Sequence, residues 1–504
     1  MQSIVEFDWI KKWSLYRPGA SAVTELETER SLNYGELDEL AESLASWTRN
    51  YQNWAKGDRI AVLSENNLEM VVLFALCQKA GLILVPLNYR LNPKELGQLL
   101  SDCSPKILLY EEKFEELVQN IPRKDTLVTS LRGFVRQNSR RLSGPWSPPT
   151  IKEDDPIFLL YTSGTTGLPK GVIYTHRMLF WNSVNTALSI RLDQSSVTIN
   201  CMPLFHTGGW NVLLTPLLHR GGHTIMMRKL DPGKLLNGLE RWKCTVFMAV
   251  PTILKMLSDE KDFVFKTFPD LMYILAGGEP MPLPQIEKWH EKAVPIRQGF
   301  GMTEAGPNLF SLHQDDTMRK KGSIGRPNFY VQTKVVDPDG KVVAQNERGQ
   351  LLLKGPMVTP GYWKNEKATG NAFTADGWFQ TGDVVIVDEE HYFFVLDRIK
   401  NMYISGGENV YPAEVERALI DYPAVEEVVV IAVPHEKWGE VGHAFVVSSA
   451  GDAPSKNDLK KHCEERLAKF KIPKYFTFLE SLPKNATGKL DRIRLKEIAS
   501  GQKS

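Results

Sequence analysis

Short apolar runs alternate with stretches of helical period along most of the chain. Residues 59–66 (RIAVLSEN), 68–81 (LEMVVLFALCQKAG) and 82–88 (LILVPLN) form one such unit and predict a strand, an amphipathic helix and a strand. The apolar runs do not alternate with polar positions, which is typical of strands buried on both faces. This pattern predicts an α/β fold in which helices cover mostly parallel sheets.

The pattern changes near Gly322, where turn residues separate shorter apolar runs. An Asp-Gly pair within residues 332–343 (QTKVVDPDGKVV) predicts a hairpin turn. Residues 349–356 (GQLLLKGP) and 390–398 (EHYFFVLDR) are predicted as short strands between turns. We therefore expect a small antiparallel, β-barrel-like subdomain here.

A compact α+β pattern begins after Asp397. Pro412 is placed to open a helix, and a capping-box pattern from Ser455 to Asp458 marks the start of another. We expect residues 1–397 to form a large domain with two helix-covered, mostly parallel sheets and the barrel-like part. Residues 398–504 are expected to form a small, mobile α+β domain.

Composition excludes several classes of protein. The chain has 504 residues, 42% of them apolar and 24% charged, which is ordinary for a soluble globular protein. The formal net charge of +1 gives no electrostatic basis for binding nucleic acid or an anionic membrane. Its five cysteines contain no C-x-x-C pair and predict free thiols in a reducing compartment. With no signal-peptide pattern and no apolar run near the roughly 20 residues that span a bilayer, we expect a cytoplasmic location.

One stretch, residues 161–171 (YTSGTTGLPKG), cannot build a core. Closely spaced glycines let backbone N–H groups converge on an anion, and hydroxyls and Lys170 add donors suited to phosphate. The Walker A pattern does not fit, because Gly171 follows Lys170 where Ser or Thr is needed. The alternative to a phosphate site is a mobile surface loop.

Six further motifs elsewhere in the chain decide between a phosphate site and a mobile surface loop. The further motifs, in chain order, are PLFHTGG (203–209), AGGEP (276–280), QGFGMTEAG (298–306), GWFQTGD (377–383), DRIKNMYISGGENVYPAEVE (397–416) and PKNATGK (483–489). Together with the glycine-rich loop they resemble the motifs of the adenylate-forming (AMP-binding) superfamily, in its acyl-CoA synthetase or fatty acid–CoA ligase branch. The resemblance runs through nearly the whole chain.

The resemblance implies an AMP-forming acid–thiol ligase. Such an enzyme joins a carboxylate to the α-phosphate of ATP, releases pyrophosphate, and transfers the acyl group to CoA. The implied cofactors and substrates are ATP, Mg²⁺, CoA and a carboxylic acid, and we expect a monomer or homodimer. A non-catalytic AMP-binding sensor is disfavoured, because Lys170, Glu304 and Lys489 are all retained.

The resemblance also assigns roles to single residues. The phosphate loop comprises Thr162, Ser163, Gly164, Thr165, Thr166, Gly167 and Lys170. The nucleoside contacts are Gly277, Gly278, Glu279, Phe300, Gly301, Asp383 and Arg398. The catalytic residues are Lys489, Thr303 and His206, and Glu304 is the carboxylate associated with Mg²⁺. The CoA contacts are Gly406, Gly407, Trp438 and Phe470, and the C-terminal domain is expected to turn about Lys400.

Several of these residues also have a plain structural interpretation. Thr303 could cap a helix, Glu304 could be a surface carboxylate, and Asp383 could be a turn residue after glycine. Trp438 and Phe470 could belong to the half-buried core of the small domain.

The acid substrate is the least determined part of the interpretation. Residues 202–211 (MPLFHTGGWN) contain no acidic residue that could hold an α-ammonium group, which argues against an amino acid. His206 resembles a gate histidine, and Trp210 could close an acyl tunnel. The expected pocket walls are small or apolar: Gly208, Gly209, Met248, Val250, Gly277, Gly299, Gly301 and Met302. We expect a medium- or long-chain fatty acid; the alternatives are an aryl or cinnamate-type acid, and a carrier protein in place of CoA.

Overall fold

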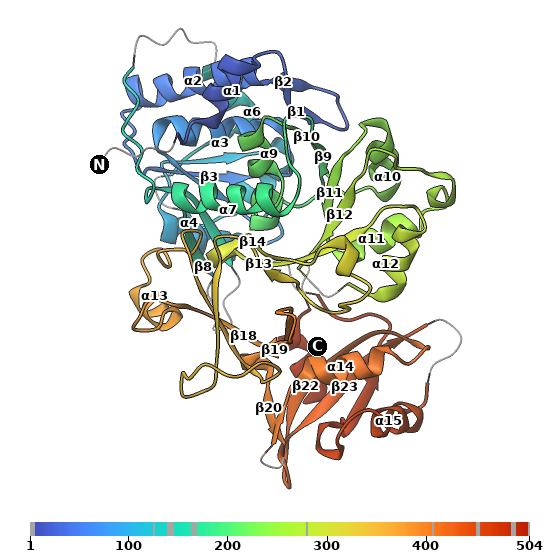
Figure 1. The fold of residues 1–504 in the computed structure, drawn as a ribbon. Helices are drawn as coiled ribbons and strands as arrows, with labels where there is room; N and C mark the ends of the chain where they lie inside the picture. The colour runs from blue at the N-terminus through green and yellow to red at the C-terminus, as the bar shows by residue number, and fades with distance from the viewer. Residues whose placement is uncertain are drawn as a thin grey trace. The chain divides into compact units, whose positions relative to one another are not determined.

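The computed structural model confirms the α/β class, with a large N-terminal part and a smaller C-terminal part (Figure 1). It describes residues 6–123, 126–138, 146–162, 169–278, 281–405, 408–449, 454–484 and 490–501. No helix in these ranges is long and apolar enough to cross a membrane. All five cysteines are buried free thiols, as predicted.

Packing divides the chain into two compact units. The first holds residues 1–333 and 353–379, and the second holds residues 334–352 and 380–504. The boundary at Asp397 stays a prediction, because packing alone does not locate the residue about which a domain turns.

The first sheet of the larger unit has the strand order β6-β5-β3-β4-β7-β8. Its strands are β3 (Arg59–Leu63), β4 (Ile83–Pro86), β5 (Ile107–Tyr110), β6 (Leu127–Ser130), β7 (Pro156–Thr162) and β8 (Lys170–Thr175). All neighbours are parallel except β7 and β8, which are antiparallel. The helices connected to this sheet are α2 (Tyr34–Asn50), α3 (Leu68–Ala80), α4 (Pro93–Cys103), α5 (Glu115–Gln119), α6 (Leu131–Asn138) and α7 (His176–Ser189).

The helix α3 differs from the prediction for this unit. The sequence predicted an amphipathic helix between β3 and β4, but all thirteen residues of α3 are buried. A helix with apolar residues on most of its circumference is buried inside the protein. Its one buried cation, Lys79, pairs with Asp8 at 2.8 Å and Asp38 at 2.5 Å, so its charge is compensated.

Two further sheets complete the larger unit. The second has the order β2-β1-β10-β9, and the third has the order β11-β12-β13-β14-β15. The strands of the second are β1 (Ser21–Glu25), β2 (Ser31–Asn33), β9 (Val197–Asn200) and β10 (His223–Met226). The strands of the third are β11 (Val246–Ala249), β12 (Tyr273–Ala276), β13 (Ile296–Met302), β14 (Gly306–Ser311) and β15 (Arg326–Pro327). Figure 1 shows α10 (Pro232–Arg241), α11 (Pro251–Ser258) and α12 (Leu283–His290) beside β11 and β12. The remaining helices of this unit are α1 (Trp9–Tyr16), α8 (Thr207–Asn211), α9 (Leu214–Arg220) and α13 (Glu366–Ala372).

The fourth sheet, β16-β17-β18-β19, is the small β-rich part that the turn pattern predicted. Its strands are β16 (Gln332–Val336), β17 (Gly349–Lys354), β18 (Phe379–Val387) and β19 (Phe393–Arg398). The strands β18 and β19 are antiparallel, with Asp383 opposite Arg398. This register places two residues of separate sequence motifs side by side.

The fifth sheet has the order β21-β20-β23-β22, with β24 paired to β23. Its strands are β20 (Tyr403–Ser405), β21 (Glu408–Val410), β22 (Val425–His435), β23 (Gly439–Ser448) and β24 (Tyr475–Phe478). Its helices are α14 (Pro412–Ile420), α15 (Lys456–Glu464) and α16 (Arg492–Ala499). Both predicted helix starts are confirmed: Pro412 is the first residue of α14, and Ser455 and Asp458 form the capping box of α15.

Candidate active site

The base of the glycine-rich loop is a strand pair. Thr162 ends β7 and Lys170 begins β8; the two residues are opposite each other, and the Thr162 hydroxyl donates to the Lys170 carbonyl at 3.5 Å. The Lys170 ammonium lies 5.1 Å from the centre of the Tyr362 ring. Ser163, Gly164, Thr165, Thr166 and Gly167 lie outside the described residues, so their phosphate-binding role stays a prediction.

The carboxyl end of β13 carries the next pair of predicted residues. Thr303 and Glu304 form a short 3-10 turn directly after this strand. The Thr359 N–H donates to the Glu304 carbonyl at 2.7 Å, and the Tyr362 hydroxyl donates to Glu304 Oε1 at 3.0 Å. The backbone of Glu304 is therefore fixed by Thr359, and its partly exposed carboxylate is held by Tyr362.

Tyr362 and Thr359 were not predicted from the sequence as site residues. Both belong to residues 359–364 (TPGYWK), which lie outside the motifs quoted above. The available signal was an aromatic pair after a glycine, which on its own is equally typical of a turn.

Parallel strands bring the adenine-binding candidates to one edge of the third sheet. The strands β11, β12 and β13 are parallel, and Gly277 and Gly278 follow the carboxyl end of β12. Gly278 has φ +88°, a conformation that favours glycine. Ligands of open α/β sheets bind at this edge. Glu279 lies outside the described residues, so its role stays a prediction.

Phe300 lies in β13, and its ring meets that of Phe310 edge-on at 5.7 Å. Its neighbour Gly301 is required by packing: a Cβ there would lie 2.1 Å from the Pro307 carbonyl oxygen. Gly301 therefore lacks a side chain because two backbone segments approach closely. Its being glycine is no argument that it lines a pocket.

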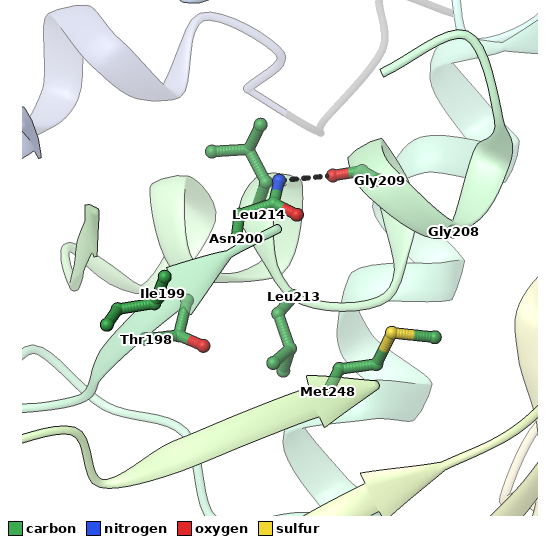
Figure 2. Close-up of a pocket in the computed structure, with 8 residues that line it drawn as sticks. All are labelled: Thr198, Ile199, Asn200, Gly208, Gly209, Leu213, Leu214 and Met248. Atoms are coloured by element: carbon green, nitrogen blue, oxygen red, sulfur yellow. Dashed lines mark hydrogen bonds between the residues drawn. The ribbon is translucent and has the colours of Figure 1, made fainter. Parts of the chain in front are cut away.

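Figure 2 shows a recess lined in part by Gly208, Gly209 and Met248, three of the predicted walls of the acyl pocket. Its lining residues are Thr198, Ile199, Asn200, Gly208, Gly209, Leu213, Leu214 and Met248. The Asn200 side-chain amide donates to the Gly209 carbonyl at 2.7 Å and holds the start of α8 against β9. A Cβ on Gly209 would lie 2.4 Å from the Pro203 carbonyl, whereas one on Gly208 would meet nothing within 4 Å among the described residues. Gly208 is thus the glycine that leaves free space.

His206 directly precedes α8 and is partly exposed. Its ring centre lies 4.5 Å from that of Phe205, whose ring meets Tyr89 edge-on at 5.1 Å. His206 is therefore a partly exposed neighbour of an aromatic cluster, and its gate role stays a prediction.

Trp210 lies deep in the larger unit. Its side chain is fully buried, with ring centres 5.1 Å from Phe158 and 5.7 Å from Phe74. These neighbours belong to β7 and α3, so the indole fills the core beneath the first sheet. A residue that closes a tunnel is also buried, so the role of Trp210 in an acyl tunnel stays a prediction.

Among the described nucleotide-binding candidates, Asp383 is an acid whose pKa is clearly shifted. It is 3% exposed; its Oδ1 pairs with Arg398 Nε at 2.6 Å, while its buried Oδ2 has no partner among the described residues. Burial raises the pKa of Asp383 to about 6, against the lowering effect of Arg398. A buried carboxylate with one open oxygen fits a ligand that brings hydroxyl donors.

The CoA candidates are only partly described. Gly406, Gly407 and the catalytic candidate Lys489 lie outside the described residues and stay predictions. Trp438 and Phe470 are 38% and 37% exposed, with Lys437 4.9 Å and Lys471 5.8 Å from their respective ring centres. Exposed aromatic rings flanked by cations are suited to an anionic nucleotide.

Comparisons with known proteins show the family of the chain. The family described as AMP-binding enzyme matches residues 10–363, and the AMP-binding enzyme C-terminal domain matches residues 414–489. A feruloyl-CoA synthase from Amycolatopsis is 35% identical over 96% of both chains. A long-chain-fatty-acid–CoA ligase from Mycobacterium tuberculosis is 33% identical over 95% of both chains. 

Solved structures give the same result. The o-succinylbenzoate CoA synthetase of Bacillus subtilis, solved with its acyl-adenylate intermediate, has a TM-score of 0.87 and 32% identity over 97% of this chain and 98% of that one. The same synthetase has been solved with ATP and a magnesium ion. The chain therefore belongs to the AMP-binding enzyme family and is an AMP-forming acid–thiol ligase that uses ATP, Mg²⁺ and CoA.

Proposed function

We propose that the chain joins an apolar carboxylic acid to CoA through an acyl-adenylate, with Asp383 as the ribose-binding group. The observation that carries the assignment is the open Oδ2 of this buried carboxylate. A buried polar atom without a partner is rare, because it loses its hydration without replacement. The two hydroxyls of a ribose would supply the missing donor, and Arg398 holds the carboxylate in place.

In the first half-reaction, an oxygen of the acid attacks the α-phosphorus of ATP, and the bond to pyrophosphate breaks. Lys170 would bind the terminal phosphates, and Thr303 would donate to the α-phosphate. Phe300 offers a ring face for adenine. None of these residues adds negative charge near the attacking carboxylate, which suits the meeting of two anions.

Glu304 fits a magnesium site of the usual kind. Among the described residues, no group of three or more histidine, cysteine or acidic side chains gathers to hold a metal ion. Magnesium commonly takes one or two carboxylates and completes its coordination with phosphate oxygens and water. When bound, the ion neutralises phosphate charge. The hydrogen bond from the Tyr362 hydroxyl would keep the carboxylate in place for this role, and the bond from Thr359 N–H fixes the backbone that carries it.

In the second half-reaction, the CoA thiol attacks the acyl carbon, and the bond between that carbon and AMP breaks. We propose that Lys489 stabilises the first step and that rotation about Lys400 then presents Gly406 and Gly407 to the thiol arm. The exposed rings of Trp438 and Phe470 would bind the adenine of CoA.

For the acid we propose an aromatic compound. One argument for a long acyl tunnel is weakened, because Gly301 serves backbone packing. Aromatic acids are also named for two relatives, the feruloyl-CoA synthase and a 2-succinylbenzoate–CoA ligase of Bacillus cereus that is 34% identical over 97% of this chain and 98% of its own length. A medium- or long-chain fatty acid is the second candidate, favoured by the mycobacterial relative.

A panel of acids tests the proposed substrate class. The purified chain is given ATP, Mg²⁺, CoA and, in turn, a benzoate, a cinnamate and fatty acids of increasing length, and AMP and acyl-CoA are quantified. We expect equal amounts of the two products and a kcat/KM at least about tenfold higher for the best aromatic acid. A fatty acid that exceeds every aromatic acid by that factor would reverse the assignment.

A further inference from the structure

Tyr362 touches two of the proposed site residues at once. Its hydroxyl donates to Glu304 Oε1 at 3.0 Å, and the Lys170 ammonium lies 5.1 Å from its ring centre. All three side chains are partly exposed, so a nucleotide or a metal ion could reach them.

The backbone around Tyr362 fixes this arrangement. Residues 359–363 run along β8 as an additional short pairing: Tyr362 bridges Val172, and the Trp363 N–H donates to the Gly171 carbonyl at 2.8 Å. The Thr359 hydroxyl donates to the Ile173 carbonyl at 2.7 Å. The segment is therefore tied to the strand that carries Lys170.

The same segment is tied to the strand end that carries Glu304. The Thr359 N–H donates to the Glu304 carbonyl at 2.7 Å. Gly361 allows this tight path, because its φ is +144° and a Cβ there would lie 2.4 Å from Thr369 Cγ2. Tyr362 thus joins two catalytic elements that are about 130 residues apart in the sequence.

We propose that Tyr362 is a positioning residue for the adenylation step, which holds the Glu304 carboxylate toward magnesium and keeps the Lys170 ammonium available for phosphate. This inference rests on the proposed function. The hydroxyl occupies one carboxylate oxygen, Oε1, and so fixes the orientation of the other. The ring holds Lys170 by a cation–π contact, which is weaker than the charge-assisted hydrogen bonds that phosphate offers.

The neutral phenol contacts two side chains of opposite charge. If Lys170 paired directly with Glu304, each would neutralise the other, and both would be lost to an incoming nucleotide and its metal ion. The neutral ring and hydroxyl add no opposite charge to either side chain, so both remain available to a nucleotide and its metal ion.

The test measures binding rather than turnover. Titration calorimetry gives the affinity for a non-hydrolysable ATP analogue with and without Mg²⁺, and the ratio of the two affinities reports the metal's contribution. Tyr362→Phe removes the hydroxyl and keeps the ring, so we expect this ratio to fall roughly fivefold while the Mg²⁺-free affinity is unchanged. Tyr362→Leu also removes the ring, so the Mg²⁺-free affinity should fall as well, by roughly threefold.

Matched variants show whether Tyr362 acts through Glu304. Glu304→Gln should lower the ratio on its own, and adding Tyr362→Phe to it should cause no further loss. Tyr51→Phe removes the hydroxyl of a tyrosine that is 55% exposed on another element and should leave the ratio at the wild-type value. Thermal unfolding of each variant confirms that the fold is retained.

Two outcomes separate this inference from the proposed function. A wild-type chain that does not bind the ATP analogue contradicts the proposed function itself. A wild-type chain that binds it with a clear Mg²⁺ effect, which Tyr362→Phe fully retains, overturns the role of Tyr362 and leaves the proposed function standing.

Discussion

Replacing Asp383 by asparagine should make the protein more stable and a weaker ATP binder. The carboxylate is buried, and its pKa is raised to about 6 from the usual 3.8. The folded state therefore holds a proton that the unfolded state has released, so the free energy of unfolding falls as the pH rises from about 4 to about 6 and stays low above that. The shift corresponds to at most about 3 kcal/mol.

Asparagine removes this penalty but weakens the contact with Arg398. Because the arginine is 43% exposed at its side chain, the lost pairing should cost no more than about 1 kcal/mol. We expect the variant to be about 2 kcal/mol more stable than wild type at pH 8, with no advantage at pH 4. ATP affinity should fall by about tenfold or more, because a charged acceptor for the ribose hydroxyls is lost.

The assay is thermal unfolding of both proteins across this pH range, with ATP binding measured at pH 8. A difference of about 2 kcal/mol corresponds to several degrees in a unit of this size. Asp397→Asn is the matched control: Asp397 is also buried, but its oxygens accept from Arg398 N, Asn401 Nδ2 and Ala413 N, so its variant should lose stability. The reasoning is refuted if Asp383→Asn is less stable than wild type at pH 8, or if its advantage does not depend on pH.

Three further substitutions test other parts of the site. Lys489→Ala should slow acyl-adenylate formation by about two orders of magnitude and largely spare thioester formation from supplied acyl-AMP; equal losses in both would contradict the two-step assignment. Trp210→Ala should lower the free energy of unfolding by about 3–5 kcal/mol and leave the order of preferred acids unchanged, as denaturation and rate measurements can show. Trp438→Ala should raise the KM for CoA several-fold at an unchanged KM for ATP.

The fold was well predicted from the sequence wherever the spacing of apolar residues determined whether a segment is a helix or a strand. The unit β3-α3-β4 is present, because long apolar runs can only be buried between layers. The amphipathic pattern expected for α3 was wrong, since charged residues such as Lys79 can be buried when acids from distant segments meet them. Those partners cannot be identified from a local pattern.

The site was predictable in its residue types but not in its contacts. The motifs named Glu304 and Lys170, yet Tyr362, which touches both, stands in a segment with no distinctive pattern. The glycines show the same limit. Gly208 leaves space, whereas Gly209 permits close approach of the Pro203 carbonyl, and only coordinates distinguish the two reasons for lacking a side chain.

Transfer of an oxygen isotope shows which bonds form and break in the two half-reactions. The chain is incubated with ATP, Mg²⁺, CoA and an acid whose carboxylate carries ¹⁸O, and the products are weighed by mass spectrometry. If the acid attacks the α-phosphorus and CoA then displaces AMP from the acyl carbon, one labelled oxygen must leave with AMP. When both carboxylate oxygens are ¹⁸O, we predict AMP and acyl-CoA in equal amounts, each with one labelled oxygen, together with unlabelled pyrophosphate. Unlabelled AMP, or ADP and phosphate in place of AMP and pyrophosphate, would contradict the account.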